Sequence, residues 1–131
     1  MTAISTTGRC LCGAVRYEFA PDAVLRQDFC HCESCRRATA SPVTAFVMVR
    51  EDDFRWTAEA PRTYPSSAGV TRGFCATCGT SMSYQNVEQP GEMHLYSATL
   101  DGPETASPEA HAFWSERLPW LHVTDDLPKE D

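Results

Sequence analysis

The sequence contains no hydrophobic run of the ~18–20 residues that a membrane-spanning helix needs. Its first ten residues also lack the apolar core of a secretory signal peptide, so we expect a cytoplasmic protein. Basic residues are few, 11 against 18 acidic ones, which gives a formal net charge of −7. A glycine-rich phosphate-binding pattern is absent as well. Together these features disfavour nucleic acids and membranes as partners, and we expect neither.

The chain has 131 residues, which is enough for one hydrophobic core but not for two. Its hydrophobic content of 42% and charged content of 22% are typical of a globular protein. We therefore expect a single domain over residues 1–131, with frayed ends at about 1–6 and 126–131. The acidic pair Asp125 and Asp126 has no obvious partner and is expected in a solvated tail.

Short alternating segments separated by turns predict a mostly β domain. Residues 13–19 alternate strictly, as in a half-buried strand, with Val15, Tyr17 and Phe19 on one face. Residues 42–49 are apolar on both faces, which predicts a strand covered on both sides. Further strands are expected at residues 70–74, 81–84 and 93–100. Turn signals lie at residues 51–53, 65–69, 89–91 and 101–103.

Helix signals are few. Residues 34–38 predict about one helical turn. Ser107 followed by Pro108 has the pattern of an N-cap and a first helical position, so the local signals predict a helix start there.

Seven cysteines in three groups are the feature that carries chemistry. They are Cys10 and Cys12, then Cys30, Cys32 and Cys35, then Cys75 and Cys78. An odd number of thiols in a reducing compartment fits disulfides poorly. Gaps of one and two residues between cysteines are instead typical of metal ligands.

The grouping predicts two different metal sites. In an extended segment residues i and i+2 point to the same side, so Cys10 and Cys12 can direct both sulfurs at one ion. Cys75 and Cys78 have the spacing of a zinc knuckle, and Gly79 permits a turn in which backbone N–H groups reach a sulfur. These two pairs predict a closed structural zinc site.

The remaining three cysteines, Cys30, Cys32 and Cys35, predict a second zinc site with one open position. Three protein ligands and a vacant fourth position are typical of catalytic zinc. Two alternatives stay open. Cys32 and Cys35 could join the Cys75 pair in a zinc ribbon, or the thiols could hold an iron–sulfur cluster, although no compact four-cysteine run is present.

The histidines and arginines give weaker indications of function than the cysteines. His31 lies between two candidate ligands, but strand alternation directs it to the opposite face, which favours a structural, hydrogen-bonded histidine. We expect packing or surface roles for His94, His111 and His122. Arg72 precedes the Cys75 pair, and ten of the eleven basic residues are arginines. Charge compensation of the thiolates and anchoring of substrate carboxylates are both open readings.

Four segments of this chain resemble the glutathione-dependent formaldehyde-activating enzyme family, whose domain is shared with centromere protein V. They are residues 8–15 (GRCLCGAV), 30–37 (CHCESCRR), 72–80 (RGFCATCGT) and 115–121 (SERLPWL). The resemblance implies an Mss4-like tent of small antiparallel sheets with little helix, stabilised by zinc. It also implies a structural zinc at Cys10, Cys12, Cys75 and Cys78 and a labile catalytic zinc at Cys30, Cys32 and Cys35. For residues 107–114 it implies an extended chain.

The activity that the resemblance implies is a carbon–sulfur lyase that forms or breaks down S-hydroxymethylglutathione. Glutathione would be the co-substrate, and the partners would be small thiols or aldehydes. Two alternatives remain at this point. One is a zinc lyase or hydrolase for another small electrophile, and the other is a non-enzymatic, zinc-stabilised binding module.

Overall fold

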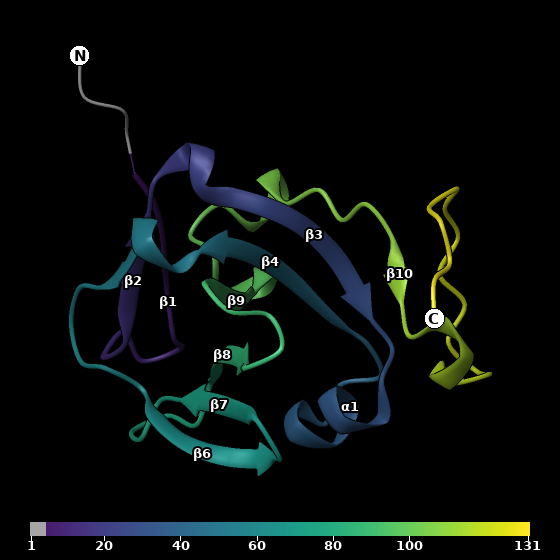
Figure 1. Ribbon diagram of the computed structural model, residues 1–131, viewed down its shortest axis with the longest axis horizontal. Coiled ribbons are helices and arrows are strands. Elements are labelled where there is room, and N and C mark those ends of the chain that lie inside the picture. Colours follow the sequence, from purple (N-terminus) through teal and green to yellow (C-terminus); the bar gives the residue numbers. More distant parts are fainter. Residues whose placement is uncertain (1–4) are drawn as a thin grey trace.

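The computed structural model describes residues 5–131 and consists mainly of two β-sheets (Figure 1). The smaller sheet has the strand order β1-β2-β5, with β1 at Thr6–Arg9, β2 at Arg16–Phe19 and β5 at Phe54–Trp56. The larger sheet has the order β10-β3-β4-β9-β8-β7-β6. Its strands are β3 (Val24–Cys30), β4 (Thr44–Arg50), β6 (Arg62–Ser67), β7 (Val70–Phe74), β8 (Ser81–Asn86), β9 (Glu92–Tyr96) and β10 (His111–Ala112). Neighbouring strands are antiparallel except for β10, which is parallel to β3.

Strand β4 runs through the middle of the protein and is buried on both faces, as predicted. Its alternation sends Val47 and Val49 to one side, where they pack in a cluster that includes Tyr17 and Phe19 of β2. This cluster joins the two sheets and forms the main hydrophobic core.

The opposite face of the larger sheet carries a second, smaller cluster. It contains Phe46 and Met48 of β4, Tyr96 of β9, and the thiols of Cys30 and Cys35. Because side chains alternate along a strand, this face is built from alternate residues of adjacent strands. A thiol at the end of β3 thus shares a surface with residues from strands far along the chain.

The predicted helix is α1 (Glu33–Thr39), the one α-helix within residues 5–131. Cys32 is its N-cap, because the Cys32 sulfur accepts a hydrogen bond from the Cys35 N–H at 3.2 Å. The helix ends at Ala40, which adopts a left-handed conformation, and Pro42 follows two residues later. Five 3₁₀ turns complete the described part of the chain: Pro21–Ala23, Glu51–Asp53, Ser97–Thr99, Pro103–Thr105 and Trp114–Glu116.

The mostly β class with little helix is confirmed, and each predicted strand overlaps an observed one. The strand predicted at residues 93–100 is wrong in its second half, because β9 ends at Tyr96 and a 3₁₀ turn follows at Ser97–Thr99. The prediction for residues 65–69 is wrong in part, since β6 continues to Ser67 and the turn begins after it. Proline is tolerated in β6 because this strand is an edge of the sheet. The pattern missed β1, β3, β5, β6 and β10.

Two expectations for the last quarter of the chain are also wrong. No helix begins at Ser107. The Ser107 N–H donates instead to the Gln27 side chain, and the segment runs extended beside β3 into β10. Residues 126–131 do not fray, because they pair with β10: the His111 N–H donates to the Pro128 carbonyl, and the Glu130 N–H donates to the His111 carbonyl. Of the other expected frayed end, residues 1–4 lie outside the described residues, and Thr6 belongs to β1.

No helix within residues 5–131 has the length and apolar character needed to cross a membrane.

Candidate metal centres

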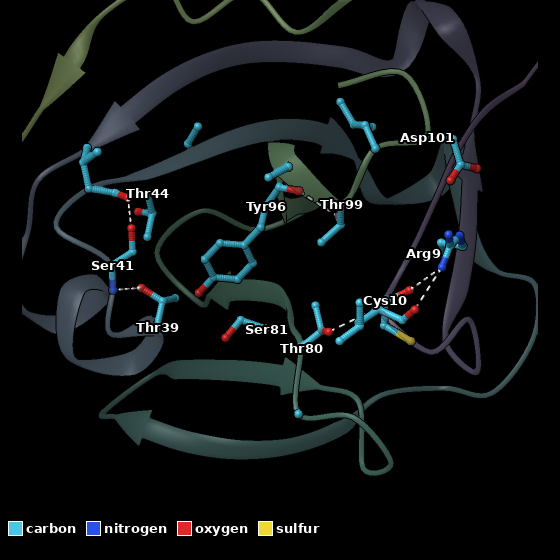
Figure 2. Close-up of a pocket in the computed structure, with 16 residues that line it drawn as sticks. Arg9, Cys10, Thr39, Ser41, Thr44, Thr80, Ser81, Tyr96, Thr99 and Asp101 are labelled. Atoms are coloured by element: carbon cyan, nitrogen blue, oxygen red, sulfur yellow. Dashed lines mark hydrogen bonds between the residues drawn. The ribbon is translucent and has the colours of Figure 1, made fainter. Parts of the chain in front are cut away.

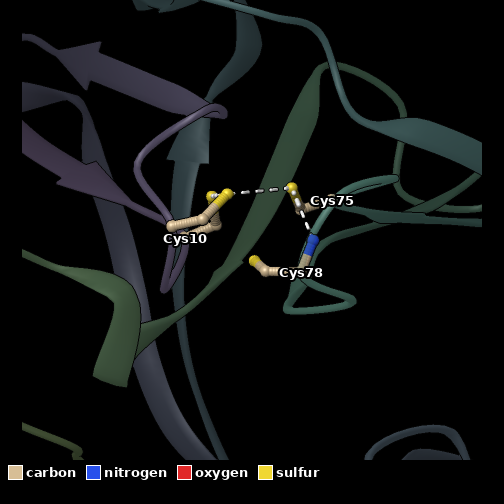
Figure 3. A group of neighbouring side chains, drawn as sticks. Cys10, Cys75 and Cys78 are labelled. Atoms are coloured by element: carbon tan, nitrogen blue, oxygen red, sulfur yellow. Dashed lines mark hydrogen bonds between the residues drawn. The ribbon is translucent and has the colours of Figure 1, made fainter.

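The first cysteine cluster lies where the turn after β1 faces the turn between β7 and β8 (Figure 3). The sulfurs of Cys10 and Cys12 are 3.6 Å apart, and those of Cys12 and Cys75 are 3.8 Å apart. All four sulfurs, including that of Cys78, lie within 4.8 Å of one another. Cys10 and Cys12 belong to a turn rather than to the expected extended segment, but their sulfurs converge all the same.

Hydrogen bonds to these sulfurs come from the surrounding backbone and hydroxyls. The Thr77 and Cys78 N–H groups both donate to Cys75 Sγ at 3.4 Å, in a turn that Gly79 closes with a φ of 80°. The Thr80 hydroxyl lies 3.1 Å from Cys78 Sγ and helps to lower the pKa of that thiol to about 5. Cys78 therefore favours the thiolate, the form in which cysteine binds a metal.

The second cluster joins the end of β3 to the start of α1. Cys30 and Cys35 are buried and their sulfurs are 3.7 Å apart, while Cys32 is half-buried. These three sulfurs also lie within 4.8 Å of one another, and no fourth cysteine, histidine or carboxylate of the described chain joins them. Hydrogen bonds from Cys30 and Cys32 lower the pKa of Cys35 to about 3, and Arg72 acts in the same direction.

Arg72 of β7 lies against this second cluster, not against the Cys75 pair that it precedes in sequence. It is 3% exposed, and its guanidinium has four partners. These are Cys35 Sγ at 3.6 Å, the Ser34 hydroxyl at 3.1 Å, the Tyr96 hydroxyl at 3.1 Å and the Ser66 hydroxyl at 3.0 Å. The contact with sulfur supports the charge-compensation reading of this residue.

The sulfur spacings fit a tetrahedral thiolate metal site. Zn–S bonds of about 2.3 Å in a tetrahedron separate the sulfurs by about 3.8 Å. The sulfur–sulfur distances of 3.6, 3.7 and 3.8 Å in the two clusters agree with this value. Both clusters can hold a metal ion, the first with four sulfurs and the second with three.

A cavity of about 620 Å³ reaches the second cluster and is lined by all three of its cysteines. Phe46, Met48 and Tyr84 form an apolar wall of this cavity, with Phe46 paired to Asp28 and Met48 to Arg26 in the strand register. Farther from the thiols the lining includes Arg26 and Asp28, which do not form an ion pair with each other. None of the four cysteines of the first cluster lines this cavity. A small molecule in this cavity can therefore approach the sulfurs of the second cluster.

The sequence matches the family model described as "glutathione-dependent formaldehyde-activating enzyme" over residues 5–116. This match covers most of the chain and includes both cysteine clusters. The chain belongs to the glutathione-dependent formaldehyde-activating enzyme (GFA) family.

Two further similarities agree with this family assignment. The chain is 32% identical over 88 residues to an uncharacterized lyase of Schizosaccharomyces pombe, a match that covers 63% of this chain and 61% of the relative. The chain thus spans about three fifths of the length of that relative. It also resembles the crystal structure of a Rhodobacter sphaeroides protein, with a TM-score of 0.61 and 29% identity, over 73% of this chain and 88% of the other.

Another cavity of this GFA-family protein, about 700 Å³ in volume, has Tyr96 in its lining (Figure 2). The ring of Tyr96 stands between hydroxyl side chains at one end, where Ser41 and Thr44 lie, and Arg9 and Asp101 at the other. Burial raises the pKa of Tyr96 to about 12, so the phenol stays protonated. Within this lining the cysteine present, Cys10, belongs to the four-cysteine cluster.

The histidine next to the second cluster has a structural partner, as predicted. His31 Nε2 lies 2.8 Å from Nδ1 of His111, and the His111 Nε2–H donates to the Asp125 carboxylate at 2.9 Å. Both imidazoles are buried, and burial lowers the pKa of His31, which keeps it neutral. The expectation of a solvated Asp125 is wrong, because this hydrogen-bonded chain ties the C-terminal segment to the cysteine-bearing loop.

Replacing His111 with alanine should lower the free energy of unfolding by about 3 kcal/mol, because it leaves a cavity and removes the hydrogen-bond partner of both His31 and Asp125. Chemical denaturation followed by circular dichroism measures this change. His122 is exposed, so His122→Ala is the matched control and should change stability by less than about 0.5 kcal/mol. Equal effects of the two substitutions would contradict the structural role of the histidine pair.

Sequence reasoning found all seven cysteines but missed the residues that surround the second cluster. Asp28, Arg26 and His94 line the cavity because of strand register, which no local motif encodes. One signal was present: Asp28 lies two residues before Cys30, and such residues share a face of a strand.

Proposed function

We propose that this protein is a zinc-dependent carbon–sulfur lyase that forms or cleaves a glutathione–aldehyde adduct, S-hydroxymethylglutathione. The observation that carries the proposal is the three-cysteine cluster that opens to a cavity. The family description names glutathione and formaldehyde, and the Schizosaccharomyces pombe relative is named a lyase. These names support the reaction class, while the open cluster supports its location.

Two zinc ions are part of the proposal. Cys10, Cys12, Cys75 and Cys78 would hold a structural ion, and Cys30, Cys32 and Cys35 would hold the catalytic one. When bound in the second cluster, zinc offers a fourth coordination position and lowers the pKa of a thiol that occupies it.

The surrounding residues support a reaction at this cluster. Arg72 donates to Cys35 Sγ and offsets part of the negative charge of three thiolates. Phe46, Met48 and Tyr84 supply an apolar wall that excludes water from the reacting sulfur. His31 is directed toward His111 and takes no part in proton transfer at the cavity.

The test is turnover above the spontaneous reaction, because thiols add to formaldehyde without a catalyst. Exchange between glutathione and S-hydroxymethylglutathione can be followed by NMR at equilibrium with the zinc-loaded protein. We expect exchange to accelerate in proportion to protein concentration. An exchange rate equal to the uncatalysed one at saturating glutathione would overturn the proposed reaction.

A further inference from the structure

A carboxylate without a partner faces the cavity of the second cluster. Asp28 lies on β3 two residues before Cys30, about 7 Å along the strand and on the same face. It lines the cavity, and its Oδ1 atom is buried. Within residues 5–131 neither oxygen of Asp28 accepts a hydrogen bond. A half-buried carboxylate without a hydrogen-bond donor is energetically costly, so a ligand that supplies a donor is favoured here.

The basic side chains of the cavity do not donate a hydrogen bond to Asp28. Arg26 directs its guanidinium to Glu92, with Nη2 at 2.9 Å from Oε1 and Nη1 at 3.3 Å from Oε2. His94 also uses its Nε2 on the same carboxylate, at 2.9 Å. Arg72 is occupied by Cys35 and three hydroxyls. Both guanidiniums in the lining are thus already paired, and Asp28 is left over.

The charge balance of the lining points the same way. Its acidic side chains, Asp28, Glu88 and Glu116, outnumber Arg26 and Arg72. Three thiolates around a divalent ion add a further negative charge. A positively charged ligand group is therefore favoured in the cavity, and a ligand carboxylate would find no free guanidinium.

We propose that Asp28 forms an ammonium-binding subsite, so that the thiol substrate carries an ammonium group that hydrogen-bonds to this carboxylate while its sulfur reaches the three-cysteine cluster. An ammonium has three N–H donors and can approach both carboxylate oxygens. This inference rests on the proposed function, since it requires that a thiol binds at the cluster. To that function the inference adds that the thiol substrate carries a positive charge and that Asp28 determines specificity for it.

The experiment compares two small thiols of equal size on the zinc-loaded protein. Cysteamine carries an ammonium where 2-mercaptoethanol carries a hydroxyl, and calorimetric titration gives both dissociation constants. The thiols also differ in acidity, so the informative quantity is the ratio of their affinities in the wild type against the ratio in Asp28→Asn. We expect the preference for cysteamine to fall about tenfold or more in the variant, as for a charge-assisted hydrogen bond.

Asp52 is exposed and lies outside the cavity, so Asp52→Asn is the matched control and should keep the wild-type ratio. A second measurement needs no variant: N-acetylcysteamine, which lacks the charge, should bind the wild type more weakly than cysteamine. If both thiols bind and the ratio is the same in Asp28→Asn, the ammonium subsite is wrong while the zinc–thiol function stands. If neither thiol binds the wild type, the proposed function itself is overturned, and the subsite with it.

Discussion

Replacing Cys75 with serine is expected to prevent stable folding. Its thiol is 1% exposed, and the cluster that it completes ties the turn after β1 to a turn more than sixty residues away. A structural zinc in such a cluster contributes on the order of 10 kcal/mol to folding. The net stability of a domain is only about 5–15 kcal/mol, so losing the site removes most or all of it.

Thermal unfolding by circular dichroism, with zinc in excess, measures this effect. We expect Cys75→Ser to show no cooperative transition, or one far below that of the wild type. The same chemical change in the second cluster, Cys32→Ser, is the matched control and should keep the transition. A wild-type midpoint for Cys75→Ser would show that the four-cysteine cluster does not hold the fold.

Cys32→Ser is expected to abolish turnover and to leave the fold intact. Cys32 is half-buried and caps α1, and serine is itself a favoured N-cap that can accept the same Cys35 N–H. The helix therefore keeps its start, while the second cluster loses one of three ligands. Loss of a metal's supporting groups alone costs about 10–100-fold, so loss of a ligand should lower turnover by a hundredfold or more.

The measurement combines the glutathione exchange rate with metal analysis of the purified variant. We expect one zinc per chain instead of two, and an exchange rate at the spontaneous level. Exchange at the wild-type rate in a variant that has lost the second zinc would exclude the cluster as the reaction centre.

The metal ligands could be predicted from sequence because their spacing is a local property. Pairs of cysteines at short gaps bring sulfurs together even when the backbone is a turn, as at Cys10 and Cys12, instead of the expected strand. Joining the two cysteine pairs in one site left three cysteines for a second site, and the structure groups the seven cysteines in the same way.

The strands around the site were harder to predict, and β3 shows why. One face of this strand carries Arg26, Asp28 and Cys30, so its hydrophobic alternation is interrupted by the polar residues that line the cavity. Polar residues at the cavity thus replace the apolar residues whose alternation would have predicted this strand. The sequence also did not show which cluster Arg72 contacts: its sequence neighbour is Cys75, but strand pairing brings it to Tyr96 and Cys35.

The C-terminal segment was misjudged because its signals are local and its contacts are not. Ser107 and Pro108 have helix-start chemistry, yet pairing with β3 keeps this stretch extended. The sequence placed Asp125 in a tail, and only the folded chain brings it to His111.

The central claim is that one cluster holds the fold and the other is open to ligands. Native mass spectrometry during titration with a chelator, with circular dichroism on the same samples, tests it most directly. We predict two zinc ions per chain, one of which is removed first without loss of β-structure, while removal of the other unfolds the protein. A single tightly held zinc, or two that leave together as the protein unfolds, would contradict the account.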